Sequence, residues 1–128
     1  MRQGDYREWE SGRHFFEVDT YVDAAKKAFE DPHENTLFVI VSDGDIPEEV
    51  FSEVPFTKGP GTEIEDLYLL SKCDAIVGPF STFNIWSSFF GKVPRYEMKK
   101  TGDSSKAVPV GISENLEEAV HYKGYHDQ

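Results

Sequence analysis

A hydroxyl-rich turn stands between an apolar run and a segment with helical spacing. The run is Ala75-Ile76-Val77, and Ser81-Thr82 follows it directly ahead of residues 83–90. The first backbone N–H groups of a helix have no partner within the helix and lie at its positive dipole end, so they bind phosphate. We therefore expect Ser81, Thr82 and the Phe83 N–H to hold a phosphate, while a hydroxyl of the turn caps the helix.

A second candidate phosphate ligand stands near the other end of the sequence. Arg2 lies in the segment Arg2-Gln3-Gly4-Asp5-Tyr6. A guanidinium binds phosphate through two parallel hydrogen bonds. Asp5 either positions this loop or is a solvated acid, and Arg2 itself has the alternative of being an ordinary surface arginine. Two phosphate ligands indicate a diphosphate, and we expect a nucleotide sugar.

The elements that must position these residues alternate between helices and buried strands. This alternation predicts one α/β domain over residues 1–128, with a Rossmann-like parallel sheet flanked by helices. In such sheets ligands gather beyond the carboxyl ends of the strands, where Ser42-Asp43 and residues 78–82 fall. The spacing predicts strands at 37–41, 75–77 and 93–98, helices at 18–30, 47–54, 62–72 and 81–90, a polar loop at 99–106, and a terminal helix capped by Ser113 or Asn115.

Two helix boundaries carry specific signals. Thr62 and Glu65 have the spacing of a capping box, in which each side chain binds a backbone N–H of the first turn. Gly91 is expected to end the fourth helix in the left-handed conformation. Trp86 and Phe89-Phe90 lie at helical spacing and are expected in the core, whereas Trp9 is the better candidate for contact with a sugar.

Composition narrows the classes of function. The net charge is −11, so the chain is expected to repel nucleic acid. No apolar run approaches the roughly 20 residues that span a bilayer. Cys73 is the single cysteine and is expected to be a small core residue, which favours a reducing compartment and hence the cytoplasm. His and Cys residues show no metal-ligand spacing, so we expect no metal or other cofactor.

Three ordered segments resemble the α-1,2-fucosyltransferase family and related GDP-fucose-dependent transferases. They are Arg2 to Tyr6, the strand end Val41-Ser42-Asp43, and Glu65 to Pro94, which holds Leu70-Ser71-Lys72-Cys73 and Ser81 to Trp86. Together they cover most of residues 1–98, and residues 99–128 lie outside the match. The resemblance implies the donor-binding half of a GT-B glycosyltransferase.

The resemblance also implies roles for single residues. Arg2 would be the catalytic residue, because it would bind the β-phosphate of GDP-fucose and stabilise the departing GDP. Asp66 lies near the family's guanine-reading acid, although an acid in the first turn of a helix can simply stabilise that helix. Asp43 follows a strand and is either a ligand contact or a turn former. The phosphates would be neutralised by Arg2 and the helix end, without a metal.

Some family features are absent from the sequence. The family histidine two residues before the arginine, the strand that leads into that motif and the acceptor-binding lobe would all fall before Met1. We therefore expect a lobe that binds GDP-sugar, meets its carbohydrate acceptor through another lobe, is inactive alone and forms a homodimer through uncovered strand edges. The alternatives are a non-catalytic nucleotide- or phosphate-binding α/β module and, from Asp43 alone, a receiver-type phosphoacceptor domain.

Overall fold

Helices and strands alternate along most of the chain. The computed structural model describes residues 1, 16–28, 36–45, 48–52, 55–101 and 104–114. In chain order their elements are α1 (Val18–Ala28), β1 (Phe38–Ile40), the 3₁₀ helix η3 (Glu48–Phe51), β2 (Phe56–Lys58), α2 (Glu63–Leu70), β3 (Ile76–Pro79), α3 (Thr82–Gly91), β4 (Arg95–Thr101) and β5 (Ser104–Gly111).

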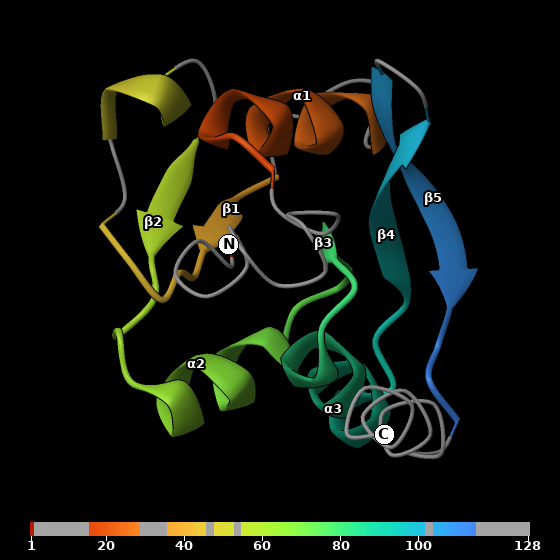
Figure 1. Cartoon of the computed structure of the whole chain (residues 1–128). Coiled ribbons are helices and arrows are strands. Elements are labelled where there is room, and N and C mark those ends of the chain that lie inside the picture. The colour runs from red at the N-terminus through yellow and green to blue at the C-terminus, as the bar shows by residue number, and fades with distance from the viewer. Residues whose placement is uncertain (2–15, 29–35, 46–47, 53–54, 102–103, 115–128) are drawn as a thin grey trace, which may run out of the picture.

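The strands form two small sheets. β1 pairs in parallel with β2, while β3 pairs in parallel with β4, and β5 joins β4 in antiparallel register. In Figure 1 the strands follow one another across the molecule in the order β2, β1, β3, β4, β5. The α/β class is thus confirmed, but the described strands do not join into one continuous parallel sheet.

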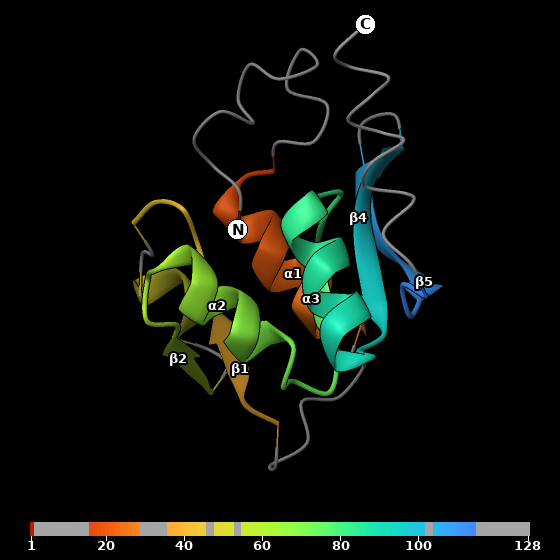
Figure 2. The same ribbon diagram turned by 90° about the horizontal axis from the view of Figure 1, so that it is seen from below.

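The helices cover opposite sides of the strands. Figure 1 shows α1 above them and α2 and α3 below them, and the view from below in Figure 2 shows α2 and α3 side by side. Each side has its own apolar cluster. Phe16, Tyr21 and Val22 pack with Phe38, Phe51 and Met98 on the α1 side, whereas Leu70, Ile76 and Val93 pack together beside α2 and α3.

Seven of the predicted elements occur at or near their predicted positions, from α1 to β4. Two strands were missed. β2 has only three residues, two of them polar, so it has no apolar run that a sequence can reveal. The predicted polar loop at 99–106 is wrong, because β4 continues to Thr101 and β5, which begins with polar residues, pairs with β4 from Ser104 onward. An antiparallel edge strand tolerates polar residues because one of its faces can meet water.

The end of α3 differs from the prediction. Gly91 belongs to the helix, and Lys92 takes the left-handed conformation with φ 55°. A Cβ on Gly91 would lie 1.9 Å from the Ser71 carbonyl oxygen. The glycine is therefore required for the close approach of α3 to the end of α2, and the stop moves one residue onward.

Two further expectations about helices are wrong. Thr62 precedes α2 as predicted, but its hydroxyl donates to Glu65 Oε1 at 2.8 Å instead of accepting a backbone N–H. Trp86 and Phe90 are exposed on α3, with their ring centroids 5.2 Å apart, so they are not core residues. Asn115 and the predicted terminal helix lie outside the described residues.

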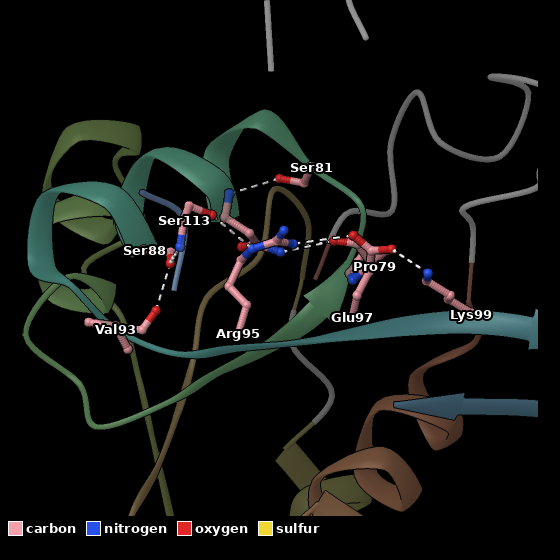
Figure 3. A network of polar contacts seen from close by, with 9 residues as sticks. Pro79, Ser81, Ser88, Val93, Arg95, Glu97, Lys99 and Ser113 are labelled. Atoms are coloured by element: carbon pink, nitrogen blue, oxygen red, sulfur yellow. Dashed lines mark hydrogen bonds and ion pairs between the residues drawn. The ribbon is translucent and has the colours of Figure 1, made fainter. Parts of the chain in front are cut away.

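A polar network ties β4 and the segment after β5 to α3 (Figure 3). Ser88 Oγ donates to the Val93 carbonyl at 2.6 Å and accepts the Ser113 N–H at 2.9 Å. Arg95 Nε donates to Ser113 Oγ at 3.3 Å, and its Nη1 lies 3.2 Å from Glu97 Oε1. Ser113 is therefore a buried structural residue, and within the described residues it does not begin a helix.

Candidate functional site

A cavity of about 530 Å³ lies between β1 and β3. Its apolar part is lined along both strands, by residues 36–41 from β1 and its flanks and by residues 73–79 from β3 and its flanks. Its polar mouth is formed by residues that follow the strands or begin α2 and α3, which are Ser42, Asp43, Gly61, Glu63, Asp66, Phe83 and Asn84. The mouth therefore falls beyond the carboxyl ends of the strands, where α/β proteins bind ligands.

Asp66 is the most unusual group of the mouth. The residue is only 5% exposed, and its Oδ1 accepts the Gly61 N–H at 3.1 Å. Among the described residues no second donor contacts this carboxylate, and Oδ2 has no partner within that part of the chain. A buried carboxylate that lacks donors is costly, and it is expected to receive hydrogen bonds from water or a ligand.

Gly59 makes room for this carboxylate. A Cβ at position 59 would lie 2.6 Å from Asp66 Oδ1 and 2.7 Å from the Val41 side chain. The Gly59 N–H also donates to the Ile40 carbonyl at 2.9 Å, which fixes the segment before α2 against β1. The sequence around Gly59-Pro60-Gly61 thus allows the backbone to wrap closely around Asp66.

The beginning of α3 contributes donors to the same region. Ser81 is buried, and its Oγ accepts the Asn84 N–H at 3.1 Å, so it caps the helix as predicted. No acceptor is found among the described residues for the N–H groups of Thr82 and Phe83. Phe83 lines the cavity, whereas Ser81 and the exposed Thr82 do not.

Asn84 was not expected from the sequence. Its Nδ2 donates to the Pro79 carbonyl at 3.1 Å, and the residue lines the cavity. This bond fixes the amide and leaves Oδ1 as an acceptor beside the cavity. The sequence does carry a signal for this residue. Asn84 lies three residues after the cap Ser81, a position from which a polar side chain can reach back to the beginning of the helix.

Asp43 and Met1 line the cavity beyond the carboxyl end of β1. Asp43 is exposed, and its N–H donates to the Met1 carbonyl at 3.3 Å. The Met1 amino group donates in turn to the Val41 carbonyl. Arg2 follows Met1 directly in the chain, but Arg2, Asp5 and Trp9 lie outside the described residues.

The described part of the mouth is acidic. Asp43, Glu63 and Asp66 line it, and no described lysine or arginine does. Such a mouth suits the N–H donors of a base or the hydroxyls of a sugar. A diphosphate requires a cation in addition to the helix end, and Arg2 is the candidate that the sequence places next to Met1.

Cys73 lies at the apolar end of the cavity and is only partly buried, so it is not the core residue that we expected. Burial, and next the charge of Asp74, raise the pKa of its thiol above the ordinary value. Its Sγ donates to the Leu69 carbonyl at 3.4 Å. At neutral pH the thiol is therefore protonated and is not a candidate nucleophile.

Within the described residues no three His, Cys, Asp or Glu side chains are grouped to hold a metal ion. None of the described helices is both long enough and apolar enough to cross a membrane.

Arg2, Asp5, Asp43, Asp66, Ser81, Thr82 and Phe83 were the predicted ligand contacts. The structure brings three of them, Asp43, Asp66 and Phe83, to one cavity. Comparisons with known protein families, with curated proteins and with solved structures find no match for this chain.

Proposed function

We propose that the chain binds a GDP-sugar, with GDP-fucose as the expected donor, as the nucleotide-sugar lobe of a fucosyltransferase-like glycosyltransferase. One observation carries this proposal. The buried Asp66 carboxylate lines the mouth of the cavity with an oxygen that has no donor among the described residues. The base of the nucleotide would supply the missing donors.

Guanine suits this carboxylate better than adenine. Guanine presents a ring N–H and an exocyclic amine on one edge, so two oxygens of one carboxylate can accept both. Adenine presents an acceptor at the equivalent ring nitrogen, which would face the carboxylate without a proton between them. Each carboxylate oxygen has two lone pairs, so Oδ1 can accept a ligand N–H in addition to that of Gly61.

The diphosphate would lie between the beginning of α3 and Arg2. The N–H groups of Thr82 and Phe83 and the positive end of the α3 dipole favour an anion there. Arg2 would neutralise the β-phosphate and stabilise GDP as it leaves. Transfer to a sugar hydroxyl would need an acceptor lobe, and the cytoplasm is the compartment that the single cysteine favours.

The second candidate is a non-catalytic nucleotide-binding module. The acidic mouth favours it, because no described lysine or arginine lines the cavity to stabilise a departing diphosphate. The two candidates share a binding site and differ in whether Arg2 stabilises the leaving group.

Calorimetric titration tests the proposal. GDP should bind the chain more tightly than ADP, and both should bind more tightly than inorganic phosphate. Binding of ADP and GDP with equal affinity would overturn the guanine assignment. Binding of GDP without any hydrolysis of GDP-fucose, with Arg2→Ala leaving GDP affinity unchanged, would favour the non-catalytic module.

A further inference from the structure

The side-chain amide of Asn84 is a second polar group of the mouth whose hydrogen bonding is incomplete. Its Nδ2 donates to the Pro79 carbonyl at 3.1 Å, and the backbone N–H of Asn84 donates to Ser81 Oγ at 3.1 Å. Among the described residues no donor contacts Asn84 Oδ1, although an amide oxygen has two lone pairs. Because Asn84 lines the cavity, a ligand bound there can supply the missing donor.

The neighbouring strand determines which end of the amide is left for a ligand. A Cβ at Gly78 of β3 would lie 2.6 Å from Asn84 Nδ2 and 4.0 Å from Oδ1, so Nδ2 is the end that lies against the strand. The reverse orientation would place Oδ1 against the Pro79 carbonyl oxygen, and two acceptors would then meet without a proton between them. Oδ1 is therefore the free acceptor, and the missing side chain at Gly78 allows the close approach.

Asn84 and Asp66 reach the cavity from the ends of two different strands. Asp66 packs beyond β1, since a Cβ at Gly59 would meet both Asp66 Oδ1 and the Val41 side chain. Asn84 lies in the first turn of α3 and bonds at the end of β3. Both residues line one cavity, so a single ligand with donors at two separate points can satisfy both.

A nucleotide has its donors in this arrangement, and at this step the inference rests on the proposed function. With the base at Asp66 and a phosphate at the first N–H groups of α3, the ribose that joins them lies beside the first turn of α3. A ribose presents two hydroxyls, and each can donate to an amide oxygen. The transferred sugar would lie on the other side of the diphosphate, farther from the cavity that Asn84 lines.

We propose that Asn84 is a specificity-determining residue, whose Oδ1 accepts a hydrogen bond from a ribose hydroxyl of the bound nucleotide. A few polar groups placed in this way fix the orientation of a ligand in a cavity that is otherwise largely apolar. The site should therefore favour ribonucleotides over nucleotides that lack this hydroxyl. The net contribution of one neutral hydrogen bond corresponds to roughly a two- to tenfold difference in affinity.

Calorimetric titration of the full chain with GDP, 2′-deoxy-GDP and 3′-deoxy-GDP tests the proposal. At least one of the deoxy analogues should bind the wild type roughly two- to tenfold more weakly than GDP. In Asn84→Leu, which keeps the size of the side chain and removes the amide, GDP and this analogue should bind with equal affinity. A purely structural role of Asn84 would weaken GDP and its analogues by the same factor and leave their ratio unchanged.

A second variant moves the amide without removing it. In Gly78→Ala the new Cβ would lie 2.6 Å from Asn84 Nδ2, so the end of the side chain must shift, and the preference for ribose should be lost again. Ser87→Ala is the control, because Ser87 is buried in α3, bonds to the Phe83 carbonyl and does not line the cavity. It should keep the wild-type ratio. Circular dichroism checks folding, and if one site variant does not fold, the other decides.

Four results would overturn the proposal. Equal affinities of GDP and both deoxy analogues for the wild type would do so while leaving the proposed binding of GDP intact. A preference for ribose that persists in Asn84→Leu would assign the hydroxyl to another group. A change in Asn84→Leu that is confined to the difference between GDP-fucose and GDP would assign Oδ1 to the transferred sugar. Absence of binding by GDP and ADP alike would also contradict the proposed function.

Discussion

At the scale of single residues, the account depends on groups that are buried without full hydrogen bonding. Within the part of the chain that the structure describes, Asp66 has one donor, the Gly61 N–H, although its carboxylate is almost fully buried. By contrast, the buried Arg95 and the partly buried Glu97 have their charges matched, since Glu97 Oε1 contacts Arg95 and Oε2 lies 3.6 Å from Lys99 Nζ. The Arg95 and Glu97 pair is therefore a structural feature, whereas Asp66 has capacity left for a ligand.

Arg2→Ala should weaken binding of GDP much more than binding of guanosine. The contact that is lost goes to phosphate, and a charge-assisted hydrogen bond contributes about 1.5–3 kcal/mol. Calorimetry with both ligands measures the difference, with Arg13→Ala as a control that removes the same charge farther along the chain. An equal loss for the two ligands would show that Arg2 does not bind phosphate.

At the scale of elements, α3 is held in place at both of its ends. Its first turn is capped by Ser81, and its last turn contacts α2 at Gly91 and the segment after β5 through Ser88. These contacts fix the helix whose first N–H groups face the proposed diphosphate. Substitutions at the far end of α3 should therefore change stability and, through it, the site.

Ser88→Ala should lower the free energy of unfolding by about 1–3 kcal/mol, because it leaves the Val93 carbonyl and the Ser113 N–H buried with one partner fewer. Ser87→Ala is the matched control. Ser87 is equally buried, but its hydroxyl donates to the Phe83 carbonyl one turn back, which the helix already satisfies. Urea unfolding of both variants gives the comparison, and equal losses would contradict the bridging role of Ser88.

Gly91→Ala should also destabilise the fold, even though alanine is the better helix former. The new Cβ would meet the Ser71 carbonyl carbon and oxygen, so the two helices must separate, at a cost of about 1–3 kcal/mol. Gly44→Ala is the control, since nothing lies within 4 Å of a Cβ there. A Gly91→Ala variant as stable as the wild type in thermal unfolding would contradict the close contact of α2 and α3.

Local patterns predicted most of the elements but not their assembly. The apolar run before Ser42 and the hydroxyl turn at Ser81 are local signals, so β1, β3 and α3 could be found. β2 is short and depends on pairing with β1, which lies well before it in the chain, whereas β5 pairs with the adjacent β4 and was missed because it begins with three polar residues. The same holds for the site, because Asp66 could be singled out from the sequence, whereas its burial by Gly59 and its neighbour Asn84 depend on tertiary contacts.

At the scale of the whole molecule, the described part of the chain exposes several large apolar side chains. Among the described residues, Leu37, Ile64, Tyr68 and Phe90 are each more than half exposed. Uncovered patches of this kind favour association, and the net charge of −11 opposes it at low salt. We therefore expect a homodimer that becomes more prominent as the ionic strength rises.

Sedimentation at two ionic strengths tests the homodimer. Repulsion between charges extends over about 10 Å at 0.1 M salt and about 30 Å at 0.01 M salt. Comparing these two conditions therefore separates the effect of charge from that of apolar contact. A larger dimer fraction in the higher salt is the expected result. A monomer in both salts would contradict self-association.

The most direct measurement of the central claim compares GDP with ADP on the wild-type chain and on Asp66→Asn. The amide keeps the size of the side chain and an oxygen for the Gly61 N–H, but it replaces one acceptor with a donor. GDP should bind the wild type more tightly, and Asp66→Asn should narrow the gap between GDP and ADP by about 1–3 kcal/mol, while Glu65→Gln on the exposed side of α2 should leave it unchanged. Equal affinities for GDP and ADP in the wild type, or a gap that Asp66→Asn does not alter, would contradict the assignment of Asp66 as the group that reads guanine.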